Sequence, residues 1–325
     1  MPKLIHWERQ IGRRLRLREL FVFFTVAEHG SMAKAASKLG VSTPSVSEAI
    51  AGLENSLGVR LLDRSSKGVV TTSYGEAVLA RGRAAFDELR QGIQDIESIA
   101  DPHVGELRIG CPEPLASGFL LPVMERLTAD YPRVKFQILQ TRQPSMELPE
   151  LHERKVDLVL APLLRDPAQG RLRDQLNAEV LFNDCFTLVV GEKSKWARRR
   201  RLQLADVINE PWIMPPLEAL DAYFSTEGFT SAGIPNCVIT TLSHHVRVNL
   251  ASSGRFITAL PRSVLKVLGK RHSLRELPIK LPVPSYPVAI MTLRNRTVSP
   301  AVRLFVERAR QVAKSLADQP RLRRS

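Results

Sequence analysis

The chain has 325 residues, of which 44% are hydrophobic and 25% are charged, a composition typical of a soluble globular protein of two or three domains. Its formal net charge of +14 favours an anionic partner such as nucleic acid. However, residues 1–100 hold 14 Lys and Arg against 11 Asp and Glu, so most of the excess lies in residues 101–325. Charge alone therefore does not indicate where DNA would bind.

The positions of the cysteines and the lengths of the apolar runs indicate the cellular compartment of the protein. Cys111, Cys185 and Cys237 are far apart and form no C-x-x-C pair, as expected of a reduced cytosolic protein. The first twenty residues carry charges throughout and lack the apolar core of a secretory signal. No apolar run approaches the roughly 20 residues that cross a bilayer. We therefore expect a cytoplasmic protein without a membrane partner.

Three short helices are expected before residue 58. The first covers residues 17–28, and the second runs from Ser31, as its N-cap, to about Leu39, with Gly40 ending it. The third begins at Thr43, which is expected to accept from the free amides, with Pro44 at the first helical position. Two short helices of small residues around a glycine turn predict a helix-turn-helix. The β-rich residues after Gly58, on either side of Ser-Ser-Lys-Gly, predict a hairpin wing.

A long helix is expected from Glu76 to about residue 100. Its apolar and small residues alternate at spacings of three and four, which is typical of a coiled-coil seam between two chains. The alternative is a helix that lies on its own domain. The residues expected to form the seam of a homodimer are Leu79, Phe86, Leu89, Ile93 and Ile96.

Residues 105–315 alternate β-rich and helical segments, which predicts an α/β fold with largely parallel sheets. Expected strands lie at 105–111, 134–141, 156–162, 185–191, 211–214, 237–241, 255–260 and 286–293. Expected helices lie near 118–130, 146–154, 218–231, 244–252 and 300–315.

The segment from Leu17 to Glu76, "LRELFVFFTVAEHGSMAKAASKLGVSTPSVSEAIAGLENSLGVRLLDRSSKGVVTTSYGE", resembles the N-terminal signature of the LysR-type transcriptional regulators. The agreement extends to Thr72-x-x-Gly75. "GELRIGC", "LHERKVDLVLAP" and "NLASSGRFITALP" are similar to landmarks of the regulatory region of that family. Glu48 and Ala51 depart from the pattern, because the family often has a basic residue at these positions, or glutamine at the first. Because of these two departures, operator preference does not transfer from relatives. About a dozen extra residues also precede the first helix.

The resemblance implies an N-terminal winged helix-turn-helix with an extension (residues 1–75), a dimerising linker helix (76–100) and a regulatory region (101–325). That region is expected to be α/β, with two lobes like a periplasmic binding protein that enclose an effector. Lobe 1 would hold about 105–164 and 277–315, and lobe 2 about 165–276, so that the chain crosses between them twice.

DNA contacts are expected at the start of the second helix, on the outer face of the third helix and at the wing. The alternative for each residue is an ordinary cap or surface charge. The candidates are Ser31, Lys34, Thr43, Pro44, Ser45, Ser47, Glu48, Arg60, Arg64 and Lys67.

Effector contacts are expected beyond the carboxyl ends of strands and near helix N-termini, where open α/β folds bind ligands. Ser145 and Ser243 could donate to a carboxylate or only cap helices, and Arg142 could pair with an anion or lie in a solvated loop. Phe256 could be core instead of ligand wall. The candidates are Cys111, Pro112, Glu113, Thr141, Arg142, Gln143, Ser145, Pro162, Ser243, His244 and Phe256.

No catalytic residue, metal site or cofactor is expected, because the sequence has no glycine-rich phosphate loop and no zinc-ligand spacing, and nothing orients Cys111 and His244 as a nucleophile and base. The predicted function is sequence-specific transcriptional regulation modulated by a small anionic organic effector. Its expected partners are a double-stranded DNA operator, copies of itself in a homodimer and homotetramer, the effector and RNA polymerase. The alternatives are an effector-independent repressor and a thiol redox sensor that pairs Cys185 with Cys237.

Overall fold

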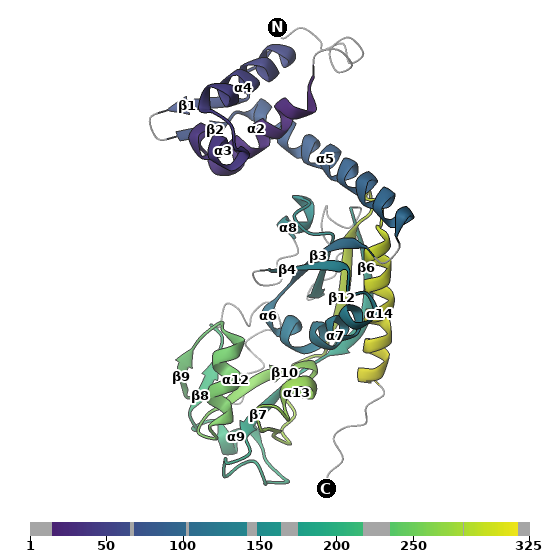
Figure 1. Ribbon diagram of the computed structural model, residues 1–325. Helices are drawn as coiled ribbons and strands as arrows, with labels where there is room; N and C mark the ends of the chain where they lie inside the picture. Colours follow the sequence, from purple (N-terminus) through teal and green to yellow (C-terminus); the bar gives the residue numbers. More distant parts are fainter. Residues whose placement is uncertain are drawn as a thin grey trace. The chain divides into compact units, whose positions relative to one another are not determined.

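The computed structural model describes residues 15–65, 68–101, 104–141, 148–163, 175–216, 235–281 and 283–317 (Figure 1). Its internal contacts divide the chain into two compact units, Met1–Arg90 and Gln91–Ser325, and each is described by itself. The helix expected near 218–231 falls outside the described residues. None of the described helices is long and apolar enough to cross a membrane.

The first unit is a winged helix-turn-helix, as predicted. Its core is built from buried apolar residues of all three short helices, including Phe23, Val26, Val46, Ile50 and Leu53, each 0% exposed. The two wing strands pair antiparallel. Its elements are α2 (Leu17–His29), α3 (Met32–Leu39), α4 (Thr43–Leu57), β1 (Leu62–Ser65), β2 (Gly68–Thr71) and the first part of α5 (Ser73–Ala100).

The turn between α3 and α4 is fixed by backbone conformation and by caps. Gly40 ends α3 in the left-handed region, at φ 66°, where a residue with a Cβ is strained. The expectation that Thr43 caps α4 is wrong, because Thr43 is already helical. Ser42 has the extended backbone of an N-cap, and its Oγ accepts from the Ser45 amide at 3.3 Å. Pro44 consequently lies in the first turn, one position later than expected.

The first half of α5 packs onto its own unit. A Cβ at Gly75 would lie 2.2 Å from the Leu61 carbonyl oxygen, and one at Gly82 would lie 2.3 Å from the Phe24 ring. Both glycines therefore permit a close crossing. Leu79 is 6% exposed within the core of the unit. The expectation that Leu79 forms a seam with a second chain is therefore wrong, and for this half of α5 the alternative of a helix on its own domain holds.

Phe86 also faces the helices of its own unit. Its ring centroid lies 5.3 Å from that of Phe24, edge to face, and 6.0 Å from that of Phe21. Leu89, Ile93 and Ile96, by contrast, are 47%, 59% and 68% exposed. The predicted stripe thus consists of two surfaces, an intramolecular half that ends at Phe86 and an exposed apolar half that begins at Leu89.

The second unit contains two five-stranded sheets (Figure 1). In the first sheet, in the order β4-β3-β5-β12-β6, the strands β3, β4 and β5 are parallel, whereas β12 is antiparallel to β5 and β6. Phe119 and Phe305, both 0% exposed, lie in its core. The elements around this sheet are β3 (Gly105–Cys111), α6 (Glu113–Leu115), the π-helix η1 (Ala116–Leu120), α7 (Leu121–Asp130), β4 (Val134–Gln140), α8 (Pro149–His152), β5 (Leu158–Pro162), β6 (Leu176–Asp184), β12 (Tyr286–Leu293) and α14 (Pro300–Ala317).

The second sheet has the order β11-β7-β10-β8-β9. The strands β8, β9 and β10 are parallel, and β7 is antiparallel to β10 and β11. Trp212, 0% exposed, is the largest side chain in its core. The elements around this sheet are β7 (Phe186–Gly191), α9 (Leu204–Val207), β8 (Trp212–Met214), β9 (Cys237–Thr240), α12 (His244–Ser252), β10 (Ile257–Pro261), α13 (Arg262–Leu268) and β11 (Leu274–Glu276).

The expectation of largely parallel sheets is wrong, because each sheet is half antiparallel. Two neighbouring strands can be parallel only when a crossover segment carries the chain back to the end of the sheet at which the first strand began. The chain reaches β7 directly from the first sheet, and it reaches β12 directly from the second sheet. These two strands therefore run against their neighbours.

The expected lobe boundaries also need correction. The strand β6 belongs to the first sheet, so the chain crosses at Cys185 and not near residue 165. Leu277, Ile279 and Leu281 pack in the core of the second sheet, so the chain returns after Leu281 and not at 277. The strands β6 and β11 and the helix α13 were not expected from the sequence.

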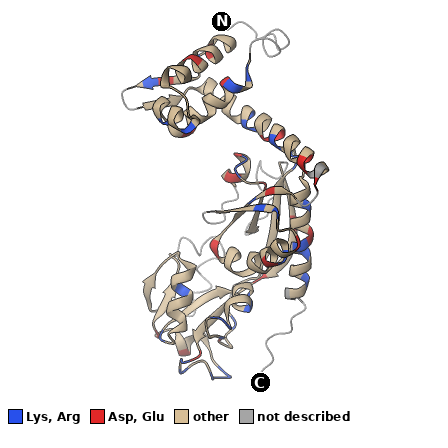
Figure 2. Ribbon diagram, viewed as in Figure 1, with Lys and Arg blue, Asp and Glu red and all other residues tan. Residues whose placement is uncertain are grey.

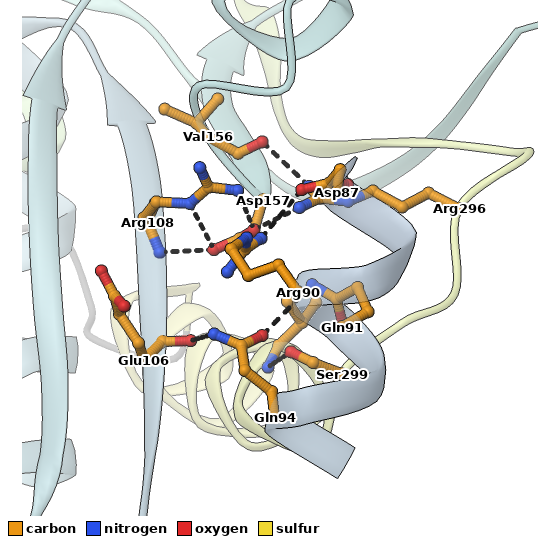
Figure 3. A network of polar contacts seen from close by, with 11 residues as sticks. Asp87, Arg90, Gln91, Gln94, Glu106, Arg108, Val156, Asp157, Arg296 and Ser299 are labelled. Carbon is orange, nitrogen blue, oxygen red and sulfur yellow. Dashed lines mark hydrogen bonds and ion pairs between the residues drawn. The ribbon is translucent and has the colours of Figure 1, made fainter. Parts of the chain in front are cut away.

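A buried ionic cluster joins β3, the start of β5 and the segment before α14 (Figure 3). The Asp157 carboxylate, 3% exposed, accepts from the Arg108 amide at 2.7 Å, from Arg108 Nη2 at 2.8 Å and from Arg296 Nη2. Arg296 Nη1 also donates to the Val156 carbonyl at 2.9 Å. Burial by itself would raise the pKa of Asp157, but the hydrogen bonds from Arg108 and the charges of both arginines lower it to about 2.

We expect Gly82→Ala to destabilise the first unit by about 1–3 kcal/mol, because the added methyl group overlaps the Phe24 ring. Gly92→Ala is the matched control on the same helix, since its Cβ would meet nothing within 4 Å. It should be neutral, or stabilising by up to about 1 kcal/mol through helix propensity. Thermal unfolding of both variants measures the difference. Equal melting temperatures for the two would show that α5 does not pack closely on α2.

Asp157→Asn should lower the free energy of unfolding by about 3–5 kcal/mol, because it removes the negative charge that pairs with the buried Arg296 and the partly buried Arg108. The folded-state pKa of about 2 lies below the ordinary 3.8, so the carboxylate stabilises the fold above about pH 5 and loses that contribution as the pH falls toward 2. Urea titrations between pH 6 and pH 2.5 should show the difference between wild type and variant shrinking. A difference that stays constant over this range would contradict the assignment.

Candidate nucleic-acid interface and small-molecule site

One face of α4 is exposed and polar, whereas the opposite face is buried in the core of the unit. Thr43, Pro44, Ser45 and Glu48 are exposed, and the Ser45 hydroxyl lies 2.8 Å from that of Ser42. Their side chains offer hydroxyl and carboxylate groups, which can donate to or accept from base edges in a major groove. The structure therefore brings four of the predicted DNA-binding residues onto one surface.

The wing carries two further predicted residues beside α4. Arg64 on β1 is exposed, and its Nη1 donates to the half-buried Ser47 Oγ at 3.2 Å. Arg60, also exposed, precedes β1. Lys67 lies outside the described residues. The Arg64–Ser47 contact shows that one of these basic side chains lies against α4.

The start of α3 is capped, with one basic side chain beside it. Ser31 Oγ accepts from the Lys34 amide at 3.4 Å, so the expected cap is present. The Lys34 side chain is exposed on the first turn. Free amides at a helix start, together with a lysine, favour a phosphate group.

Two residues that hold the wing in place were missed as site residues. Glu54 near the end of α4 accepts from the amides of Leu61 and Leu62 at 2.7 and 3.2 Å. Thr72 Oγ1 donates to the Arg60 carbonyl at 2.8 Å and accepts from the Gly75 amide at 3.1 Å. The Thr-x-x-Gly pattern in the sequence indicated the contacts of Thr72. The sequence gives no indication of the Glu54 contacts, because a glutamate near a helix end resembles an ordinary surface charge.

Among the described residues of the first unit, basic positions are mixed with acidic ones along the chain. In Figure 2 its basic segments are interspersed with acidic ones. The four consecutive arginines Arg198–Arg201 are exposed in the second unit, between β7 and α9. The longest run of basic residues in the chain therefore lies outside the first unit.

The carboxyl ends of β3, β4 and β5 meet at one edge of the first sheet, because these strands are parallel and adjacent. This edge brings Cys111, Pro112, Thr141 and Pro162 together, as the sequence predicts. Cys111 is 0% exposed in the core, however, and burial raises the pKa of its thiol. The expectation of an effector contact through the Cys111 side chain is therefore wrong.

Glu113, the first residue of α6, reaches the second lobe of the unit. One oxygen of its carboxylate accepts from the His244 amide at 3.0 Å, and the other accepts from the His245 amide at 3.1 Å. Ser243 Oγ accepts from the Val246 amide at 3.3 Å as the N-cap of α12. The structure thus joins Glu113, Ser243 and His244, three predicted effector residues, in one set of contacts.

The His244 imidazole is buried, with 1% of the residue exposed. Burial, and then the nearby Arg247 charge, lower the pKa of His244 to about 3, so the ring is neutral at physiological pH. Arg247 Nη2 lies 3.3 Å from His244 Nδ1, and a guanidinium only donates, so Nε2 carries the proton. This buried N–H has no hydrogen-bond partner within the described ranges.

Of the other predicted effector residues, three lie outside the described part of the chain and one lies elsewhere in the second unit. Arg142, Gln143 and Ser145 fall in the gap between residues 141 and 148 of the described ranges. Phe256 directly precedes β10, which is parallel to β8 and β9, so it lies at the amino-terminal edge of the sheet. Ser243 follows the opposite edge. The expectation that Phe256 lines the effector site is therefore wrong.

The position of the cysteines contradicts an intramolecular redox pair. The strands β10 and β8 separate β7, which follows Cys185, from β9, which begins at Cys237. Across the sheet, Cys237 of β9 is paired with Trp212 of β8, which is paired with Ile257 of β10. The register of β10 with β7 places Ile257 level with Val190, which lies five residues along the chain from Cys185. Strand spacings of about 4.8 Å and residue rises of about 3.3 Å put the two roughly 20 Å apart. A disulfide needs Cα atoms within about 7 Å.

Comparison with protein families assigns both parts of the chain. Residues 17–76 match the model described as "Bacterial regulatory helix-turn-helix protein, lysR family", and residues 100–314 match "LysR substrate binding domain". The HTH-type transcriptional regulator GbpR of Azospirillum brasilense is 27% identical over 301 residues, which cover 89% of this chain and 84% of that protein. The HTH-type transcriptional regulator TdcA of Escherichia coli (strain K12) is 25% identical over 300 residues, which cover 91% and 93%.

Solved structures share the fold. CbnR, a LysR family transcriptional regulator, superposes with a TM-score of 0.62 at 20% identity and covers 92% of this chain and 99% of its own. A full-length OxyR variant from Pseudomonas aeruginosa gives a TM-score of 0.63 at 19% identity, with 92% and 97% covered. With a winged helix-turn-helix that matches over residues 17–76 and a two-sheet region that matches the substrate-binding domain over residues 100–314, the chain belongs to the LysR family of DNA-binding transcriptional regulators.

Proposed function

We propose that this regulator reads its operator through the exposed face of α4, as a dimer formed by α5, and that a small anionic effector modulates its activity from between the two sheets of the second unit. The observation that carries the DNA-reading part is the polar face of α4, with Ser45 and Glu48 exposed and Val46 and Ile50 buried behind them. A helix presented in this way fits the major groove.

The exposed half of the α5 stripe supports dimerisation. Leu89, Ile93, Ile96 and Ile99 are 47%, 59%, 68% and 84% exposed and follow a spacing of three and four. Large apolar side chains grouped on one face of a helix mark an interaction surface, and this spacing suits a partner helix. A homotetramer, contact with RNA polymerase and a cytoplasmic location stay predictions.

The effector part of the proposal is supported by the way the fold gathers strand ends and the start of α12. Thr141 and Pro162 lie at the carboxyl edge of the first sheet, and Ser243 and His244 start α12. The Glu113 carboxylate on the amides of α12 shows that this helix start accepts an anion. The same contact also favours the second candidate function, an effector-independent repressor, because Glu113 already occupies the amides that an effector would bind.

The double variant Ser45→Ala plus Glu48→Ala should lose or change operator preference, by about 1–3 kcal/mol for each lost base contact. Lys34→Ala is the contrasting variant, because loss of a phosphate contact weakens specific and non-specific duplexes alike. Competition binding against random duplex at fixed salt measures the specificity ratio. An unchanged ratio and footprint in the double variant would count against α4 as the reading helix.

Ile93→Asp should weaken dimerisation at least about tenfold, because pairing would bury an uncompensated carboxylate. The Ile93 side chain is 59% exposed in the single chain, so the fold itself should tolerate the change. Ala80→Asp is the matched control, since it adds the same charge at an exposed position of α5 about 140° around the helix from Ile93. Sedimentation should give a lower mass for Ile93→Asp alone. Wild-type mass for both variants would place the dimer interface elsewhere.

A further inference from the structure

The start of α12 is occupied by a carboxylate that comes from another part of the chain. Glu113 is 131 residues before His244, on the lobe of the first sheet, and each of its two oxygens accepts one amide of α12. A helix start exposes amides that need acceptors, and the helix dipole favours a negative charge there. The contact thus uses the geometry by which a helix N-terminus binds a free carboxylate ligand.

The Glu113 contact leaves one buried donor of the same residue without an acceptor. His244 Nε2–H is buried and has no hydrogen-bond partner within the described part of the chain. An unsatisfied buried donor costs about 1–3 kcal/mol. Glu113 therefore satisfies the amide of His244 but not its ring.

The position of Glu113 allows it to leave. The residue is half-buried and His245 is exposed, so solvent reaches the contact. Glu113 lies on a helix of three residues that continues directly into the π-helix η1, Ala116–Leu120. Single π-turns are rare and occur frequently at functional sites. A short element beside such a turn can change conformation without unfolding the sheet behind it.

From these observations we propose that Glu113 is an internal competitor of the effector. It holds the amides of α12 in the free protein, and the effector acts by placing its own carboxylate there in place of Glu113. The effector is thus a carboxylate. This inference rests on the proposed function only for its effect on DNA binding. Whether Glu113 or a ligand carboxylate occupies the amides of α12 can be tested without DNA.

Competition explains how an occupied site can still be a regulatory site. The effector binds only those molecules in which Glu113 has left α12, so its apparent affinity falls by the fraction of such molecules. Its binding breaks a contact between the two lobes, and this is the differential interaction that a population shift requires. If Glu113 were bound permanently to the amides of α12, by contrast, no ligand could replace it.

The test removes Glu113 and supplies a carboxylate from solution. In Glu113→Ala, hydrogen exchange at the amides of His244 and His245 should rise about tenfold over wild type. Sodium acetate, used as the probe, should restore protection and raise the melting temperature of this variant. Neither change should occur with sodium chloride at the same ionic strength. Glu307→Ala removes an exposed carboxylate from α14 of the same lobe and is the matched control, for which no acetate response is expected.

Glu113→Gln keeps the proposal falsifiable if the alanine variant does not fold. Its amide offers one acceptor oxygen without charge, so exchange should lie between wild type and Glu113→Ala. Unchanged exchange in both variants, or acetate acting equally on wild type and Glu113→Ala, would overturn the proposal. Absence of any acetate rescue would leave Glu113 as a permanent cap and would overturn it as well. Failure of duplex binding with acetate rescue intact would instead contradict the proposed function alone.

Discussion

The backbone amides at helix starts impose the constraint on which both functional surfaces of this chain depend. Each helix leaves its first amides without intrahelical acceptors, and the sequence supplies those acceptors in different ways. Ser31 and Ser42 cap α3 and α4 locally, which leaves the surface around both helix starts open to a DNA backbone. At α12 the local cap Ser243 is supplemented by Glu113 from the other lobe.

The same constraint joins the two lobes at a second place. Asp184, at the end of β6, accepts from the Ser263 amide at 3.2 Å and from the Ser263 hydroxyl at 2.5 Å at the start of α13. Asp184 is 4% exposed, and burial raises its pKa despite these bonds. It directly precedes the crossing at Cys185, so this contact lies where the chain passes from the first sheet to the second. Glu113 lies away from the crossing, partly open to water, and can exchange where Asp184 cannot.

Sequence patterns predicted local features better than the partners of each surface. The helix-turn-helix followed from small residues, Gly40 and the cap at Ser31, all of which act within a few positions. The α5 stripe was recognised, but periodicity cannot tell which chain a face packs against. Gly82 and Phe86 proved to face Phe24 of the same unit. A spacing of three and four residues predicts which face of a helix is buried, but it does not predict which element packs against that face.

Long-range contacts were the part that sequence reasoning could not supply. Glu113 was a candidate because it follows β3, but nothing local shows that its carboxylate meets α12, 131 residues later. Phe256 was placed wrongly because the direction of β10 relative to β8 and β9 depends on topology. The lobe boundary was set about twenty residues too early because β6, with a mixed pattern of exposed and buried residues, lacks the continuous apolar run of β5.

Footprinting of the full-length chain on duplex DNA from upstream of the genes it controls tests the central claim most directly. A dimer that reads DNA through α4 should protect two half-sites related by two-fold symmetry, with centres one helical turn of about 34–36 Å or a multiple of it apart. Protection should persist in the presence of excess random duplex at physiological salt. A single asymmetric site, or protection that random duplex abolishes, would contradict the account.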